Sequence, residues 1–197
     1  MRNFVIQLLR NKFVMLLRNI ANIQTGLFTK PAGFGDVVYL QSKHFDEKGQ
    51  LVGELHPDLT ADNISEKHLL NPGDVLFAAK GTKNFAAVYE NHNQSAVAST
   101  SFFVIKVIDK KVLPDYLAWF LNHPQTQNYL KSKARGTSIP SIAKSALEDL
   151  KITIPSLEKQ KLIIRISELT LKETELRIRI LTQRNQLIEK QIMNALK

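Results

Sequence analysis

Three short polar segments rich in basic residues have the chemistry of a DNA-binding surface. Residues 80–84 (KGTKN) place two ammonium groups, a hydroxyl and an amide around a flexible glycine. Such a loop can offer cations and backbone N–H groups to phosphates while its amide pairs with a base edge. Residues 131–138 (KSKARGTS) repeat this composition, and Arg135 could bind guanine through a fork of two hydrogen bonds. Residues 41–44 (QSKH) are a third candidate. The residues predicted to bind DNA are Gln41, Ser42, Lys43, His44, Lys80, Gly81, Thr82, Lys83, Asn84, Lys131, Lys133, Arg135, Gly136, Thr137 and Ser138.

Patterns typical of catalysis or metal binding are missing from the sequence. There is no cysteine, which excludes a catalytic thiol, a zinc–thiolate site and a disulfide. The five histidines are scattered without metal-ligand spacing. Residues 33–35 (GFG) lack the remainder of a phosphate-binding glycine-rich loop. We therefore predict no catalytic residue, no metal and no cofactor in this chain.

The net charge of +9 is distributed unevenly. Residues 1–35 carry five basic residues and no acidic one, residues 36–155 carry 13 of each, and residues 156–197 carry nine basic and five acidic. Because the middle of the chain is neutral overall, a nucleic-acid interpretation depends on local clusters rather than on the isoelectric point. A solvated basic face that binds no ligand is the alternative interpretation.

Length and composition indicate one folded domain with an appendage. The chain has 197 residues, of which 44% are hydrophobic and 23% charged. Basic residues interrupt the apolar run at the N-terminus, so we predict no membrane span, and that run lacks a signal-peptide cleavage site. A cytoplasmic location fits these features and the absence of cysteine.

Glycine, proline and aspartate divide the first part of the chain into short segments. Several of them are rich in β-branched and aromatic residues, and two others begin with proline, which is favoured at the first position of a helix. This pattern predicts an α+β fold with a mixed β-sheet. The predicted strands lie in residues 35–40, 71–78, 86–89, 102–108 and 151–154, and the predicted helices in residues 114–122 and 124–133.

The composition changes sharply at Pro155, and residues 156–197 contain no glycine or proline. Ser156 is a suitable N-cap, so we predict one long helix from this point. Its apolar residues recur at heptad spacing, and a second apolar stripe runs beside them near the end. The predicted helix is longer than folding back on the head requires, which favours pairing with another helix. The residues predicted to make this contact are Leu162, Ile166, Leu169, Leu176, Ile180, Leu187, Ile188 and Ile192.

Five segments in order resemble the target recognition domain of specificity subunits from Type I restriction-modification systems. Residues 17–26 (LRNIANIQTG) resemble the opening segment of the family's recognition domain, and residues 70–77 (LNPGDVLF) resemble its central motif. The strongest match is residues 150–160 (LKITIPSLEKQ), where strand, proline, glutamine and long helix follow one another as in the family. The other two matching segments are residues 114–122 (PDYLAWFLN) and 134–142 (ARGTSIPSI).

The resemblance implies a DNA-reading subunit without catalysis of its own. In the family, each recognition domain reads half of a bipartite site and the long helices pair antiparallel. Methyltransferase subunits that dock on the specificity subunit bind S-adenosylmethionine and modify adenine. A separate translocase-nuclease subunit supplies cutting driven by ATP with Mg. The resemblance therefore implies residues 1–155 as the recognition domain, with 1–15 as a basic N-terminal extension, and 156–197 as the helix for dimerisation and methyltransferase docking.

This sequence departs from the family's pattern in one respect. Specificity subunits usually have two recognition domains and two long helices in one chain, whereas this sequence has one of each. We therefore expect a homodimer, related by a two-fold axis, that reads a palindromic bipartite site. Two alternatives stay open: a truncated fragment of a two-domain specificity subunit, and a stand-alone DNA-binding coiled-coil regulator.

Overall fold

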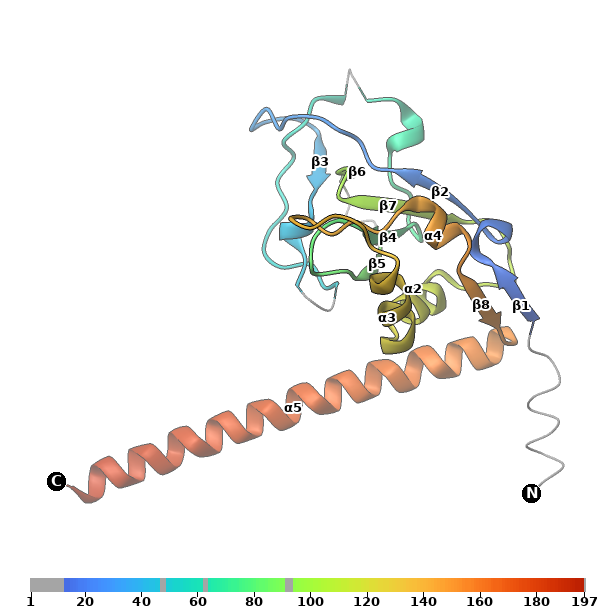
Figure 1. The fold of residues 1–197 in the computed structure, drawn as a ribbon. Helices are drawn as coiled ribbons and strands as arrows, with labels where there is room; N and C mark the ends of the chain where they lie inside the picture. The colour runs from blue at the N-terminus through green and yellow to red at the C-terminus, as the bar shows by residue number, and fades with distance from the viewer. Residues whose placement is uncertain (1–12, 47–48, 62–63, 91–93, 197) are drawn as a thin grey trace, which may run out of the picture. The chain divides into compact units, whose positions relative to one another are not determined.

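The computed structural model describes residues 13–46, 49–61, 64–90 and 94–196 (Figure 1). The chain divides into two compact units, residues 1–160 and residues 161–197. We call the first unit the head. The predicted α+β class is confirmed, because the head combines β-strands with short helices and a long helix follows it.

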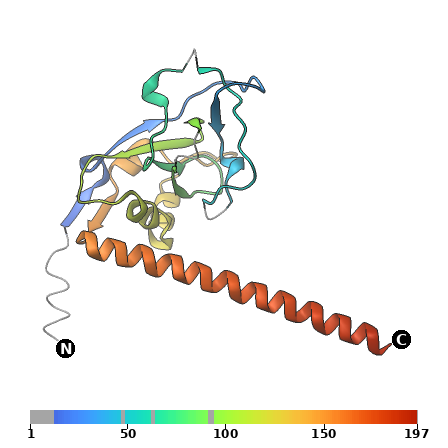
Figure 2. The same cartoon turned by 180° about the vertical axis from the view of Figure 1, so that it is seen from behind.

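The strands of the head form three sheets, which Figure 2 shows from behind. The central sheet is antiparallel and has the order β2-β7-β4-β5. A parallel pair, β3-β6, and an antiparallel pair, β1-β8, stand beside it, so strand directions are mixed over the head as a whole. The strands are β1 (Phe13–Leu16), β2 (Ala21–Thr25), β3 (Val37–Leu40), β4 (Val75–Ala78), β5 (Ala86–Val88), β6 (Ser95–Ala98), β7 (Phe102–Val107) and β8 (Lys151–Ile154).

The central strand β4 is the best-buried element of the head. All four of its residues are buried, because β7 and β5 pair with its two edges and other apolar groups cover its faces. A strand buried in this way is continuously apolar rather than alternating, as the letters VLFA show. Phe77 and Phe102 are completely enclosed, and burial of each side chain stabilises the fold by about 1.5–3 kcal/mol.

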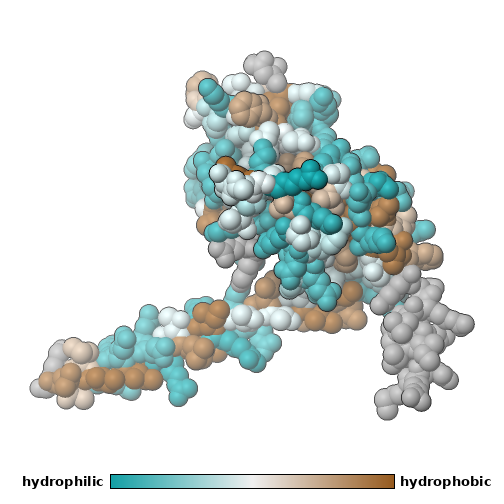
Figure 3. Space-filling view, in the orientation of Figure 1, coloured by the Kyte–Doolittle hydropathy of each residue, from teal (hydrophilic) through white to brown (hydrophobic). Residues whose placement is uncertain are grey.

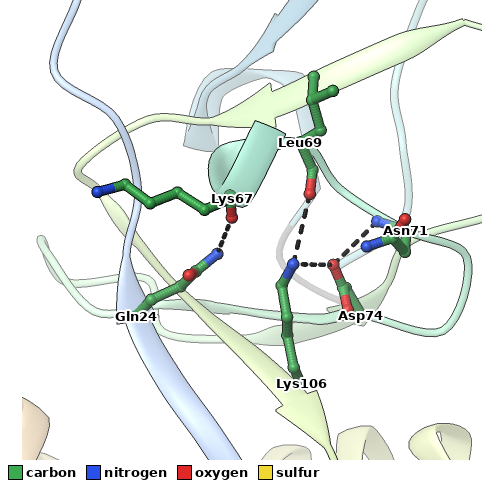
Figure 4. A network of polar contacts seen from close by, with 6 residues as sticks. All are labelled: Gln24, Lys67, Leu69, Asn71, Asp74 and Lys106. Carbon is green, nitrogen blue, oxygen red and sulfur yellow. Dashed lines mark hydrogen bonds and ion pairs between the residues drawn. The ribbon is translucent and has the colours of Figure 1, made fainter. Parts of the chain in front are cut away.

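The turn before β4 is held by the buried carboxylate of Asp74 (Figure 4). This carboxylate accepts the Asn71 backbone N–H at 2.9 Å and lies 3.7 Å from Nζ of Lys106 on β7. The same ammonium group donates to the Leu69 carbonyl at 3.5 Å. Burial raises the pKa of Asp74, although the Asn71 N–H and Lys106 act in the opposite direction.

Among the described residues of the head, three short α-helices support the sheets: α2 (Pro114–Asn122), α3 (Pro124–Ser132) and α4 (Lys144–Glu148). The predictions for α2 and α3, including proline at the start of each, are confirmed. Asn122 closes the open edge of β5, because its side-chain oxygen accepts the Ala86 N–H and its amide donates to the Ala86 carbonyl, both at 2.7 Å. Tyr116 on α2 donates its hydroxyl to the Thr153 carbonyl of β8 at 2.6 Å.

The contacts of Gln160 show that the head ends a few residues beyond Pro155. Its side chain is completely buried; the amide oxygen accepts the Leu113 N–H, and the amide nitrogen donates to the carbonyls of Lys111 and Pro155. The first turn of the long helix therefore belongs to the compact head. At the other end, residues 13–15 belong to strand β1 and not to an extension, because they pair with β8. The rest of the expected extension, residues 1–12, lies outside the described residues.

The long helix α5 (Leu157–Ala195) has 39 residues and confirms the predicted element. At about 1.5 Å per residue it extends about 58 Å. Beyond residue 160 it carries the predicted heptad residues, and each of these is exposed, including Ile180 at 61%. Ion pairs such as Glu173–Arg177 at 2.6 Å connect successive turns. No described helix is long and apolar enough to cross a membrane.

Candidate nucleic-acid interface

Two of the three predicted DNA-binding segments are joined by backbone hydrogen bonds. The loop at residues 79–84 follows β4, and the segment at residues 135–141 forms a small hairpin. The N–H of Gly81 donates to the Pro140 carbonyl at 2.8 Å, and the N–H of Ile142 donates to the Ala79 carbonyl at 2.9 Å. These bonds hold the hairpin against the end of the central strand.

The third segment lies on the other side of the same loop. Residues 42–44 form a short 3-10 helix, η2 (Ser42–His44), directly after β3. Ser42 and Lys43 line an open hollow of about 390 Å³. Lys80, Gly81, Thr82 and Lys83 of the loop line the same hollow.

Aromatic packing explains why η2 and the loop at residues 79–84 meet. Phe45 follows η2, and its ring centroid lies 5.4 Å from that of Phe85 and 5.5 Å from that of Phe102. Phe85 and Phe102 also pack edge to face at 5.9 Å. Burial of these apolar rings fixes the position of the polar residues on either side of them. Phe45 and Phe85 also line the hollow.

We call the exposed cations gathered in this way, Lys43, Lys80, Lys83 and Arg135, the basic face. They come from three loops that are distant in sequence, and the hairpin and η2 lie beside each other in both ribbon views (Figures 1 and 2). Clustered cations of one sign attract the phosphates of a nucleic acid and release their counterions.

Some of the predicted residues have structural roles within the loops. The amide of Asn84 donates to the Ala78 carbonyl at 2.9 Å, which braces the loop against β4. Nδ1 of His44 accepts the Gln41 N–H at 3.2 Å and so supports η2. Burial lowers the pKa of His44, Lys43 lowers it further and Asp58 opposes both, which favours the neutral imidazole. Which side chains contact DNA stays a prediction.

Lys131 and Lys133 are set apart from the hollow. Lys131 lies in the last turn of α3, and Nζ of Lys133 is 5.7 Å from the ring centre of Tyr129 on that helix. Both side chains are exposed. Thr137 and Ser138 are exposed at the tip of the hairpin, as is Ile139, which is not among the residues predicted to bind DNA.

The described residues contain no cluster of histidine, aspartate and glutamate that could hold a metal ion. The hollow beside the basic face is lined by cations, hydroxyls and apolar rings, which suit an anion. This arrangement can bind phosphates and present side chains to base edges.

Comparison with known proteins identifies the family. The family model described as Type I restriction modification DNA specificity domain matches residues 24–190. The chain belongs to this family. It is 31% identical over 104 residues to the Type I restriction enzyme MjaVIII specificity subunit of Methanocaldococcus jannaschii, covering 52% of this chain and 23% of the relative. It is 30% identical over 133 residues to the HindI specificity subunit of Haemophilus influenzae, covering 66% of this chain and 28% of the relative.

Solved structures show the same fold. The HsdS subunit from Thermoanaerobacter tengcongensis matches with a TM-score of 0.66 and 21% identity, covering 87% of this chain and 44% of that one. The S subunit from M. genitalium matches with a TM-score of 0.57 and 15% identity, covering 84% of this chain and 40% of that one. The chain thus spans about a quarter of the curated relatives and under half of the solved family members.

Proposed function

We propose that this chain is a DNA-specificity subunit of a Type I restriction-modification system that reads one half of a bipartite site through its basic face. The observation that carries the proposal is that two basic segments line one hollow and a third, the hairpin, is bonded to one of them, in a chain of this family. Cations at the rim position the phosphate backbone, while Arg135 and the polar side chains of the loops can reach base edges.

On this proposal, the subunit itself performs no catalysis. Methyltransferase subunits that dock on it supply S-adenosylmethionine chemistry on adenine, and a translocase-nuclease subunit supplies cutting with ATP and Mg. This division of labour agrees with a hollow lined by cations, hydroxyls and apolar rings, which suit binding more than bond cleavage.

The long helix is proposed to pair two copies of the chain. Its apolar side chains between Leu162 and Ile192 are exposed along a heptad stripe, and burial against a second helix would remove that surface from water. A two-fold pair places the same recognition domain on each half-site, so the target is expected to be palindromic. The same helix is also proposed to dock the methyltransferase subunits.

The test is to co-express the chain with a Type I methyltransferase subunit from the same genome and to map methylated adenines in host DNA by single-molecule sequencing. We expect a new two-part palindromic motif. A variant with both Lys80→Ala and Lys83→Ala should lose this methylation. The matched variant Lys110→Ala, whose exposed lysine lies after β7 and outside the basic face, should retain it.

Other outcomes separate the competing functions. An asymmetric two-part motif would contradict the homodimer and favour a fragment that works with another recognition domain. A third outcome is that both proteins are soluble but no methylation appears, while the chain alone binds a specific duplex tightly. The chain is then a stand-alone DNA-binding regulator.

A further inference from the structure

The hairpin at residues 135–141 is a rigid support for its tip. Arg135 and Ser141 exchange both backbone hydrogen bonds, at 2.9 and 2.8 Å, so the hairpin is closed at its base. At the tip, Gly136 has a φ of +104°, and a Cβ at this position would lie 2.8 Å from the Ile139 carbonyl oxygen. On the far side of the tip, the Pro140 carbonyl is fixed by Gly81. The hairpin is therefore bonded at its base and at Pro140, the residue that follows Ile139.

Ile139 is presented to solvent at this tip. Its side chain is 66% exposed, whereas Ile142 three residues later is 1% exposed. Isolated exposed aliphatic residues are common on proteins and need no special role by themselves. Ile139 differs because a braced hairpin holds it and because the residues around it are polar or cationic, including Ser138 and Arg135. In Figure 3 a small hydrophobic patch lies among hydrophilic surface where the hairpin runs in Figure 1.

The combination of cations and one braced aliphatic side chain suits a particular kind of DNA contact. Proteins that bend DNA insert an apolar wedge between adjacent base pairs while cations hold the phosphates on either side. A wedge must resist the base stack that it opens, so its backbone needs support from the fold. The bonds to Gly81 and Ala79 provide this support, because the loop that contains them follows the buried strand β4.

We propose that Ile139 is a wedge that inserts between adjacent base pairs of DNA bound at the basic face. The inference rests on the proposed function, since it requires the basic face to bind DNA. On this proposal, the chain itself unstacks the duplex locally within its half-site, before any methyltransferase acts. Flexible pyrimidine–purine steps cost less energy to unstack than other steps. The wedge therefore also favours such a step at the point of insertion.

The experiment uses the full-length chain and a duplex that it selects from a pool of random-sequence DNA by repeated capture. 2-Aminopurine then replaces adenine at successive positions of the selected duplex, and its fluorescence is recorded with and without protein. We expect fluorescence to rise at one step in each half-site, where stacking is lost. Ile139→Ala should abolish the rise and weaken binding about tenfold, the scale of one lost base contact. It should leave the dependence of binding on salt unchanged.

Matched variants separate insertion from a general loss of structure. Ile139→Leu retains an aliphatic side chain of similar size and should keep the fluorescence rise. Ile108→Ala removes an isoleucine that is also exposed, at 57%, but lies after β7, and it should behave as the unaltered chain.

The outcomes distinguish this inference from the proposed function. If the chain enriches no duplex but the co-expression test yields the new methylated motif, only the wedge is wrong; if neither appears, both are wrong. If the chain binds with strong salt dependence but no position brightens, or if Ile139→Ala still brightens the step, only the wedge is wrong. If Ile139→Ala keeps the fluorescence rise but loses methylation in the co-expression test, Ile139 makes a protein contact and the wedge is wrong.

Discussion

The backbone N–H of Gly81 donates to the carbonyl oxygen of Pro140 at 2.8 Å. This bond connects the loop after the central strand with the tip of the hairpin at residues 135–141. The bond uses only backbone atoms, so it occupies no side chain of either segment. The basic face is therefore held together by the main chain and by the apolar rings beneath it, and the side chains of Asn84 and His44 brace the loops that carry it.

Gly136→Ala should disturb the hairpin more than the same change at an uncrowded glycine. The φ of +104° and the approach of a Cβ to the Ile139 carbonyl at 2.8 Å are both unfavourable for alanine. We expect a loss of stability of about 1–3 kcal/mol and weaker DNA binding. Gly53→Ala is the control, because Gly53 has a φ of +82° with open space around it. Urea denaturation and DNA titration of both variants measure the difference, and equal losses would argue against crowding at the tip.

Lys80→Ala should reduce the salt dependence of DNA binding. If its ammonium group contacts one phosphate, the slope of log K against log salt should fall by about 0.9, for all sequences alike. Lys110→Ala should leave the slope unaltered, because that lysine lies outside the basic face. Fluorescence anisotropy over a range of salt concentrations gives both slopes. An unchanged slope for Lys80→Ala would remove this residue from the interface.

The elements that sequence predicted correctly are those with strong local signals. β4 is a continuous apolar run after a turn, α2 and α3 begin with proline, and α5 contains no helix breaker. Among the missed strands, β1 has the apolar letters FVML, but three of its four residues fall in the predicted N-terminal extension, whereas β6 and β2 lack strong local signals. β6 has the letters SAVA and β2 the letters ANIQT, which have weak strand propensity, and they adopt strand structure because β3 and β7 pair with them.

The candidate site could be predicted only in part for a similar reason. The composition of each loop was visible in the sequence, but their convergence depends on long-range contacts such as Phe45 with Phe85. The sequence does not predict a role for Ile139 in DNA binding, because the chemistry typical of such contacts lies in polar side chains. Its exposure follows from the hairpin, and nothing local in the sequence distinguishes it from the buried Ile142.

Asp74→Asn should change how stability depends on pH. Burial raises the pKa of Asp74 above its ordinary value of 3.8. The folded state then binds the proton more tightly than the unfolded state, so this group's contribution to stability is lost as pH rises from 3.8 through the folded pKa. Asparagine does not titrate but keeps a side-chain oxygen for the Asn71 N–H. Calorimetry gives the melting temperatures of the unaltered protein and of Asp74→Asn. The difference between them, unaltered minus variant, should therefore fall as pH rises through this interval. A difference that increases with pH would mean that Lys106 outweighs burial.

Gln160→Ala should destabilise the head. The substitution removes three hydrogen bonds and leaves the Leu113 N–H and the Lys111 carbonyl without this partner. We expect a loss of about 2–3 kcal/mol, since buried groups left unsatisfied are costly. Urea denaturation measures it. Gln125→Ala removes the exposed side chain of a glutamine on α3 and should have little effect. Equal stability of the two variants would show that the bonds of Gln160 are not needed.

Ile180→Asp should weaken self-association of the chain. Ile180 is 61% exposed in the heptad stripe of α5, and in the proposed pair it would face the second helix. A carboxylate there would be buried among apolar side chains, so the dissociation constant should rise about tenfold or more. Gln186→Asp places the same carboxylate on the polar side of the helix and should leave association unchanged. Sedimentation equilibrium of both variants gives the comparison. If the unaltered chain sediments as a monomer, or if Ile180→Asp dimerises equally well, the heptad stripe does not pair two copies and the palindromic target loses its structural basis.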